Sequence, residues 1–257
     1  MQFIKLSLTA LCLGLITACG GSGGGGDNSG NTTTPLNDNA TSPTTNVDTP
    51  NTPNTETNNT TGQVLKIKNG NGVIENLNTT NLSSIIVDGQ TIHITIPGIN
   101  SGTWAALNNQ NTCCGSYDSV KIGGVFGVEN EYLFYNGIPT NVAQIPQEGQ
   151  ATYKGEFLYS SEAQGRYETS RNTRAATFEV DFGNKTLNGK LDASMTAVTI
   201  EANITGNQFD GKAISVNEVV EGKVQGQFFG ENAKQLGGLA AANDNTSWNA
   251  VFAAQKQ

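Results

Sequence analysis

The sequence predicts an all-β protein in which a small strand-rich domain, here called the handle, precedes an eight-stranded antiparallel β-barrel. Two patterns predict this fold class. Apolar residues recur at every second position in short runs, and turn-forming residues separate these runs at hairpin spacing. The composition agrees, because 31 glycines and only 14% charged residues disfavour a helix-rich protein. We therefore expect the ordered part of this 257-residue chain to consist mainly of hairpins.

Four segments are expected along the chain. A leader occupies 1–18, and a lipidated cysteine with a disordered tether occupies 19–62. The handle is expected at 63–147 and the barrel at 148–257. The tether is rich in Asn, Thr, Gly and Pro and contains no Lys or Arg, so it has too little apolar surface to fold. It would hold the folded body clear of a membrane surface.

The leader has the features of a bacterial lipoprotein signal. Lys5 precedes an apolar run at 6–16, which suits the core of a signal peptide and is shorter than the roughly 20 residues of a membrane-spanning helix. Residues 16–19, Ile-Thr-Ala-Cys, resemble the lipobox, which implies cleavage before Cys19 and lipid attachment at Cys19. The alternative is an ordinary signal peptide. The expected location is the outer membrane, with the protein surface-exposed and touching the membrane through its lipid anchor only.

The charge and the motifs exclude several classes of function. A formal net charge of −8 gives no electrostatic basis for binding nucleic acid. The chain has one histidine and lacks the GxSxG, HExxH and Walker patterns, so it offers no recognisable pairing of nucleophile and base. We expect a protein that is not an enzyme, holds no metal site and requires no cofactor.

Residues 178–182 show the barrel pattern clearly, since Phe, Val and Phe alternate with Glu and Asp. The same period recurs near the end of the chain, where Trp248, Ala250 and Phe252 are expected to point inward. Eight strands at hairpin spacing make a small closed barrel that its own side chains fill. The expected strands are 151–159, 174–182, 186–193, 197–205, 208–216, 221–229, 235–242 and 247–254.

The end of the chain carries a family pattern. Residues 226–238 read Gly-x-Phe-Phe-Gly-x-Asn-Ala-x-x-Leu-Gly-Gly, and residues 251–257 read Val-Phe-Ala-Ala-Gln-Lys-Gln. In order and spacing they resemble the closing strands of the transferrin-binding-protein-B-like, Slam-dependent surface lipoproteins. Phe229, Glu231 and Ala253 stand where that family has Tyr, Pro and Gly. The resemblance covers about 150–257 and implies a scaffold, not a chemistry.

In the handle, strands at 84–87 and 91–96 are expected to pair around an Asp-Gly turn at 88–89. His93 lies on the polar face of the second strand, opposite its apolar neighbours. It is either an ordinary polar strand residue or a ligand to haem iron, which a single axial histidine can supply. Trp104–Leu107 predicts a short helix or turn.

The adjacent cysteines Cys113 and Cys114 are a second unusual feature. A trans peptide sets their Cα atoms about 3.8 Å apart, below the usual separation of about 4.4–6.8 Å in a disulfide. They form either a strained vicinal disulfide or two buried thiols.

The middle of the chain also resembles, more loosely, the haemophilin-type haem-binding proteins. The likeness lies in Cys-Cys-Gly-Ser-Tyr at 113–117 and in Phe-Tyr-Asn-Gly at 134–137. It implies haem as a bound cargo. His93 is then the expected iron ligand, and the residues expected to face the ligand are Tyr117, Tyr132 and Tyr135.

These resemblances imply a protein that captures haem, or a host protein that carries haem or iron. The cargo would pass to a TonB-dependent outer-membrane receptor, after export by a surface-assembly translocon. Transferrin itself fits less well, because its receptors have two lobes and this chain has one handle and one barrel. The alternatives are an immune-evasion lipoprotein that binds a host complement regulator, like factor-H-binding relatives, and a surface adhesin without a small ligand.

Overall fold

The fold was analysed in a computed structural model. It describes residues 59–257 apart from 80, 96–103, 108, 114, 116, 128–129, 162–165, 170–175, 194–195 and 217–218. The described residues all belong to one compact unit. The leader and almost all of the expected tether lie outside the described residues, so both stay predictions.

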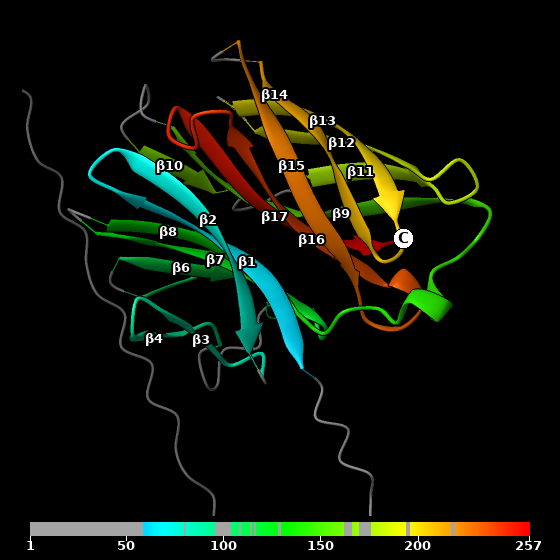
Figure 1. The fold of residues 1–257 in the computed structure, drawn as a ribbon, viewed down its shortest axis with the longest axis horizontal. Coiled ribbons are helices and arrows are strands. Elements are labelled where there is room, and N and C mark those ends of the chain that lie inside the picture. Colours follow the sequence, from blue (N-terminus) through cyan, green and yellow to red (C-terminus); the bar gives the residue numbers. More distant parts are fainter. Residues whose placement is uncertain are drawn as a thin grey trace, which may run out of the picture. The chain divides into compact units, whose positions relative to one another are not determined.

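Eight strands close into an antiparallel barrel, which confirms the predicted fold class (Figure 1). Neighbouring strands pair in sequence order, and the last strand, over its whole length, pairs with the first. Each strand begins and ends within two residues of the bounds expected from the sequence. The barrel strands are β9 (Gln150–Ser161), β11 (Ala176–Asp181), β12 (Thr186–Ala193), β13 (Thr196–Thr205), β14 (Gln208–Ser215), β15 (Val220–Phe229), β16 (Gln235–Ala242) and β17 (Trp248–Lys256).

Aromatic side chains fill the barrel, and three of them lie over glycines of the neighbouring strand. Phe209 pairs across the strands with Gly226, Phe178 with Gly189, and Phe252 with Gly238. At each of these glycines a Cβ atom would lie within 2.7 Å of the facing ring. A glycine opposite an aromatic residue lets the ring lie flat against the sheet, so more rings fit inside the closed barrel.

The handle is a six-stranded sheet in the order β2-β1-β8-β7-β6-β5 (Figure 1). A separate two-stranded hairpin lies beside it. The sheet strands are β1 (Thr60–Lys68), β2 (Asn71–Thr79), β5 (Ala105–Leu107), β6 (Gln110–Cys113), β7 (Val120–Phe126) and β8 (Asn130–Gly137). The hairpin consists of β3 (Ser84–Val87) and β4 (Gln90–His93), and the short 3₁₀ turns are η1 (Val142–Gln144) and η2 (Glu231–Ala233).

Three details differ from the expectations. The helix or turn predicted at Trp104–Leu107 is wrong: β5 is a strand, because it pairs with β6 in register. β1 begins at Thr60, three residues before the expected start of the handle. The loop expected between the first two barrel strands contains a short strand, β10 (Arg166–Thr169), which pairs with the end of β9.

Both faces of the handle sheet are covered. One face packs on the outer surface of the barrel, where Phe229, Leu239 and Val251 meet Leu65 and Leu133 of the handle. The other face packs on the β3–β4 hairpin through a cluster made by Val64, Leu77, Ile85, Val87, Ile92, Ile94, Tyr132 and Phe134. Handle and barrel therefore share a hydrophobic core.

Candidate functional site

Strand β8 sends its aromatic side chains to opposite faces of the handle sheet. Tyr135 belongs to the cluster between handle and barrel, whereas Tyr132 and Phe134 belong to the cluster under the β3–β4 hairpin. This follows from the two-residue period of a strand. Two of the tyrosines expected to face one ligand are therefore on different faces of the sheet.

Tyr117 and Tyr135 are buried between handle and barrel, with exposed fractions of 8% and 4%. The Tyr117 hydroxyl donates to the carbonyl of Lys154 at 3.3 Å, and the Tyr135 hydroxyl donates to Gln63 Oε1 at 3.2 Å. Burial raises the pKa of Tyr135 well above its usual range, so this phenol stays neutral. The Tyr117 hydroxyl therefore links the handle to barrel strand β9, whereas the Tyr135 hydroxyl links β8 to β1 within the handle sheet.

Tyr132 is also buried, and its hydroxyl donates to Asp88 Oδ2 at 3.2 Å. Burial, with the Asp88 carboxylate as the second cause, raises the pKa of Tyr132. Asp88 also forms an ion pair with Lys66 at 2.9 Å. That ion pair is the main cause that lowers the pKa of Asp88. The contacts of Asp88 tie the turn of the hairpin to β1 and β8.

His93 is exposed at the end of β4, on the outward face of the hairpin. It pairs across the hairpin with Ser84, and the next outward pair is Ile86 with Thr91. Ile86 is 65% exposed, and among the described large apolar side chains only Val219, at 83%, is more exposed. The predicted polar-face position of His93 is confirmed. The structure does not bring His93 together with Tyr132, which packs against the opposite face of the same hairpin.

Cys113 is buried and disulfide-bonded, and its partner lies outside the described residues. Cys114 and Cys19 also lie outside them, so the vicinal disulfide and the lipid attachment stay predictions. Close by, the buried amine of Lys121 donates to the carbonyls of Gly115 and Tyr117. Desolvation lowers the pKa of Lys121. The lysine therefore ties Gly115 and Tyr117 to strand β7.

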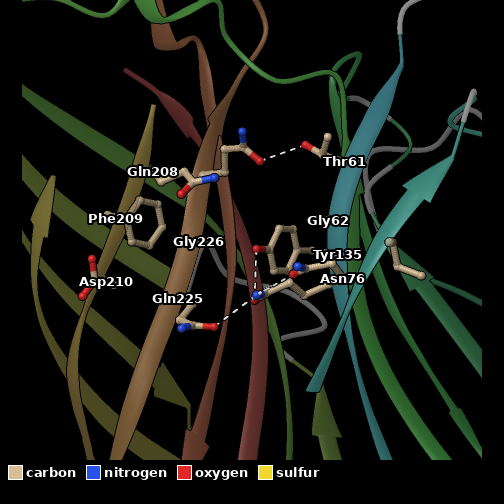
Figure 2. A pocket seen from close by; sticks show the side chains of 12 residues that line it. Thr61, Gly62, Asn76, Tyr135, Gln208, Phe209, Asp210, Gln225 and Gly226 are labelled. Carbon is tan, nitrogen blue, oxygen red and sulfur yellow. Dashed lines mark hydrogen bonds between the residues drawn. The ribbon is translucent and has the colours of Figure 1, made fainter. Parts of the chain in front are cut away.

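A groove of about 380 Å³ opens where handle strands β1 and β2 face barrel strands β14 and β15 (Figure 2). We call it the amide groove, because carboxamide side chains dominate its walls. Its residues come from five strands, and most of them occupy ordinary outward positions, so no sequence pattern marks the groove. It is lined by Thr61, Gly62, Gln63, Asn76, Leu77, Tyr135, Gln208, Phe209, Asp210, Gln225, Gly226 and Gln227.

Hydrogen bonds cross the amide groove from handle to barrel (Figure 2). Gln63 Nε2 donates to Gln225 Oε1 at 3.1 Å, and the Thr61 hydroxyl donates to Gln227 Oε1 at 2.9 Å. Gln63 Nε2 also lies 3.3 Å from Asn76 Oδ1. Gln63 is thus the central residue of this network, because its Oε1 also accepts the hydrogen bond from the Tyr135 hydroxyl.

Two negative findings apply to the part of the chain that the structure describes. It contains no group of three or more His, Cys, Asp or Glu side chains that could hold a metal ion. In the same residues, no helix is long and apolar enough to span a membrane.

The fold defines a class of β-protein in which a handle sheet is packed on a closed eight-stranded barrel. Residues 145–256 match the family described as the C-lobe and N-lobe β-barrels of transferrin-binding protein B. An uncharacterized protein of Haemophilus influenzae is 35% identical over 199 residues, which cover 69% of this chain and 68% of that relative. Transferrin-binding protein B of the same organism is 28% identical over 218 residues, covering 66% of this chain but only 35% of its own length.

Solved structures agree with the sequence relatives. A transferrin-binding protein B variant from Haemophilus parasuis superposes with a TM-score of 0.59 at 26% identity, over 76% of this chain and 44% of that one. HpuA from Kingella denitrificans, solved in complex with human haemoglobin, superposes with a TM-score of 0.55 at 17% identity, over 76% and 84% of the two chains. At that identity the HpuA match shows the fold alone. The chain belongs to the transferrin-binding-protein-B-like family, and it spans less than half the length of the two transferrin-binding proteins described above.

Proposed function

We propose that this protein is a lipid-anchored surface protein of the outer membrane that captures a host protein carrying haem or iron. The cargo then passes to a TonB-dependent outer-membrane receptor, and a surface-assembly translocon exports the protein. Relatives named for binding transferrin support this class of partner, and a protein of the same fold was solved in complex with haemoglobin. Because the chain spans only part of its transferrin-binding relatives, the partner has to be tested directly.

The observation that carries the proposal is the outward face of the β3–β4 hairpin. Its inner face is packed on the handle through Ile85 and Ile92, whereas Ile86 stands 65% exposed on the outer face beside His93. An exposed isoleucine on a hairpin that is anchored at its turn suits a protein interface, where apolar side chains enter pockets of the partner. The handle tyrosines fit this function as supports of the hairpin and the sheet.

The test is binding of the full-length protein to immobilised human transferrin and haemoglobin. Ile86→Asp should weaken binding to the recognised partner by roughly tenfold or more, as expected for a contact residue at the centre of an interface. Val142→Asp is the matched control, because Val142 is 55% exposed on η1, outside the handle sheet and the β3–β4 hairpin. No binding to either host protein, or equal losses in both variants, would overturn the proposal.

A second candidate function is direct capture of haem, which the exposure of His93 favours. His93 is the only histidine of the chain, and Ile86 on the same outward face offers apolar contact for a porphyrin. Haem titration followed by absorbance should give a saturable shift that His93→Ala abolishes. A shift that His93→Ala leaves unchanged would exclude His93 as the ligand, and absence of a saturable shift would reject haem capture.

Lipid attachment at Cys19 is tested separately. Metabolic labelling with a fatty acid should mark the wild-type chain and not Cys19→Ser, and the variant should leave the membrane fraction. A variant that keeps both label and location would refute the anchor without touching the proposal on the handle.

A further inference from the structure

The amide groove has a lining that differs from a site for haem or for an anion. Among the described residues that line it there is no lysine or arginine, and Asp210 is the only charged one. Its largest apolar side chains, Leu77 and Phe209, are 6% and 1% exposed because they belong to the handle and barrel cores. A flat apolar ligand finds little contact area there, and a carboxylate or phosphate finds no counter-charge.

The groove does offer a dense set of uncharged donors and acceptors. The side-chain amide of Gln63 forms hydrogen bonds with neighbouring side chains. The side chains of Gln208 and Asp210 form no hydrogen bond to any described residue. Both are exposed and project outward from β14, on either side of the inward-facing Phe209. Asn76 on the opposite wall keeps its Nδ2 donor free of any partner among the described residues. Free polar groups therefore lie on both walls.

We propose that the amide groove binds a neutral saccharide. Each carboxamide presents a donor and an acceptor side by side, which matches the adjacent hydroxyls of a sugar, and a carboxylate such as Asp210 can accept from two hydroxyls at once. The volume of about 380 Å³ lies near the lower end of small-molecule sites, which are roughly 300–1,000 Å³. Few other neutral ligands carry enough hydroxyls to satisfy such a lining.

This inference goes beyond the proposed function, because the groove is lined by β1, β2, β8, β14 and β15 and not by the β3–β4 hairpin. The saccharide could be free or attached to a glycoprotein, since both present the same hydroxyls. The two sources are separated by comparing free oligosaccharides with a glycoprotein before and after enzymatic removal of its glycans.

The experiment begins with the full-length protein on an immobilised panel of neutral mono- and oligosaccharides, with sialylated and sulfated counterparts included. The best ligand is then titrated by calorimetry. Asp210→Ala and Gln208→Ala should each weaken binding by roughly tenfold, the size expected for losing hydrogen bonds that involve a charged or exposed polar group. Glu221→Ala is the matched control, since Glu221 is an exposed outward carboxylate on β15 that does not line the groove.

The outcomes are decisive in either direction. Retention of neutral sugars, with loss in both groove variants and not in the control, supports the site. Failure to retain any neutral sugar, preference for sialylated or sulfated glycans, or affinity unchanged by Asp210→Ala and Gln208→Ala would each overturn it. Binding to transferrin or haemoglobin measured in the same variants keeps the two proposals apart, because the groove substitutions leave Ile86 and His93 in place.

Discussion

Tyr135 of the handle and Phe229 of the barrel form a T-shaped aromatic pair, with ring centroids 6.1 Å apart and planes inclined at 69°. Phe229 points out of the barrel because the preceding Phe228 points in. The handle accommodates the Phe229 ring with a glycine: a Cβ at Gly137 would lie 2.4 Å from Phe229 Cδ1. Phe229, a residue of the family pattern, thus packs the barrel against the handle sheet.

Phe229→Ala should destabilise the whole body by about 3–5 kcal/mol, the usual cost of truncating a fully buried phenylalanine. Because handle and barrel share this core, we expect a single unfolding transition that moves to lower urea concentration. Val142→Ala, at an exposed position, should leave the midpoint nearly unchanged. If the handle alone unfolds at lower urea concentration while the midpoint of the barrel transition is unchanged, Phe229 does not couple the handle to the barrel.

Gln63 should matter more to stability than the tyrosine that it binds. Gln63→Ala leaves the Tyr135 hydroxyl buried without its acceptor and should cost about 1–3 kcal/mol, whereas Tyr135→Phe removes the buried donor itself and should cost about 0.5–1.5 kcal/mol. Urea denaturation of both variants and of the double variant measures the order. If Tyr135→Phe proves the more damaging change, the network across the amide groove does not depend on Gln63.

The sequence was sufficient to predict the barrel because each of its strands pairs with its neighbour along the chain. Local periodicity and turn spacing then contain most of the information, and residues 178–182 show both. The exception within the barrel is the closure of β17 on β9, which the terminal motif predicted through resemblance. β5 was missed because three residues are too short to show a period, and only its pairing with β6 makes it a strand.

The sequence predicts the candidate sites less well, because their residues meet through contacts between distant parts of the chain. Tyr117, Tyr132 and Tyr135 resemble ligand-facing residues in sequence, but their hydrogen-bond partners lie 37, 44 and 72 residues away. The amide groove brings β1 next to β15, and the bond from Thr61 to Gln227 spans 166 residues. In the sequence, the outward Gln, Asn and Asp residues of the groove cannot be told from those on other strands. Only the packing of the handle on the barrel brings them together.

Glu131 should make the stability fall as pH rises from acid to neutral. Its carboxyl lies on β8 between Ile67 and Phe126, and Oε1 has no hydrogen-bond partner among the described residues. Desolvation raises the pKa of Glu131 above its ordinary 4.5, partly offset by a hydrogen bond with Ser160. A raised pKa means that the stability linked to this group is complete below about pH 4.5 and is lost as pH passes the folded-state pKa.

Glu131→Gln should therefore stabilise the protein at pH 7 by about 1 kcal/mol, which is the low end of the cost of burying a polar group without a hydrogen-bond partner. This gain should vanish below about pH 4.5, where the carboxyl is protonated in both the folded and the unfolded state. Melting temperatures across this range provide the measurement. Glu221→Gln, at an exposed position, should show no such pH-dependent gain. A gain of equal size at pH 4 and pH 7 would show that ionisation of Glu131 is not its cause.

Gly226 of the terminal motif should act through the ring that it faces. A Cβ at Gly226 would lie 2.1 Å from Phe209 Cζ and 2.6 Å from the carbonyl oxygen of Gly237. Gly226→Ala should therefore cost about 1–3 kcal/mol or more, as for other overpacked cores. Phe209→Leu, which shortens the ring that occupies this space, should cost less when introduced into Gly226→Ala than into the wild type.

A double-mutant cycle in urea tests this coupling, because additive effects are expected only of residues that do not touch. The control cycle combines Ala250→Gly with Phe209→Leu. Ala250 also belongs to the barrel core, but Phe209 pairs across the strands with Gly226 and not with Ala250. If the Gly226 and Phe209 changes add without interaction, the ring is not what requires the glycine. The motif would then be explained by the backbone contact with Gly237 alone.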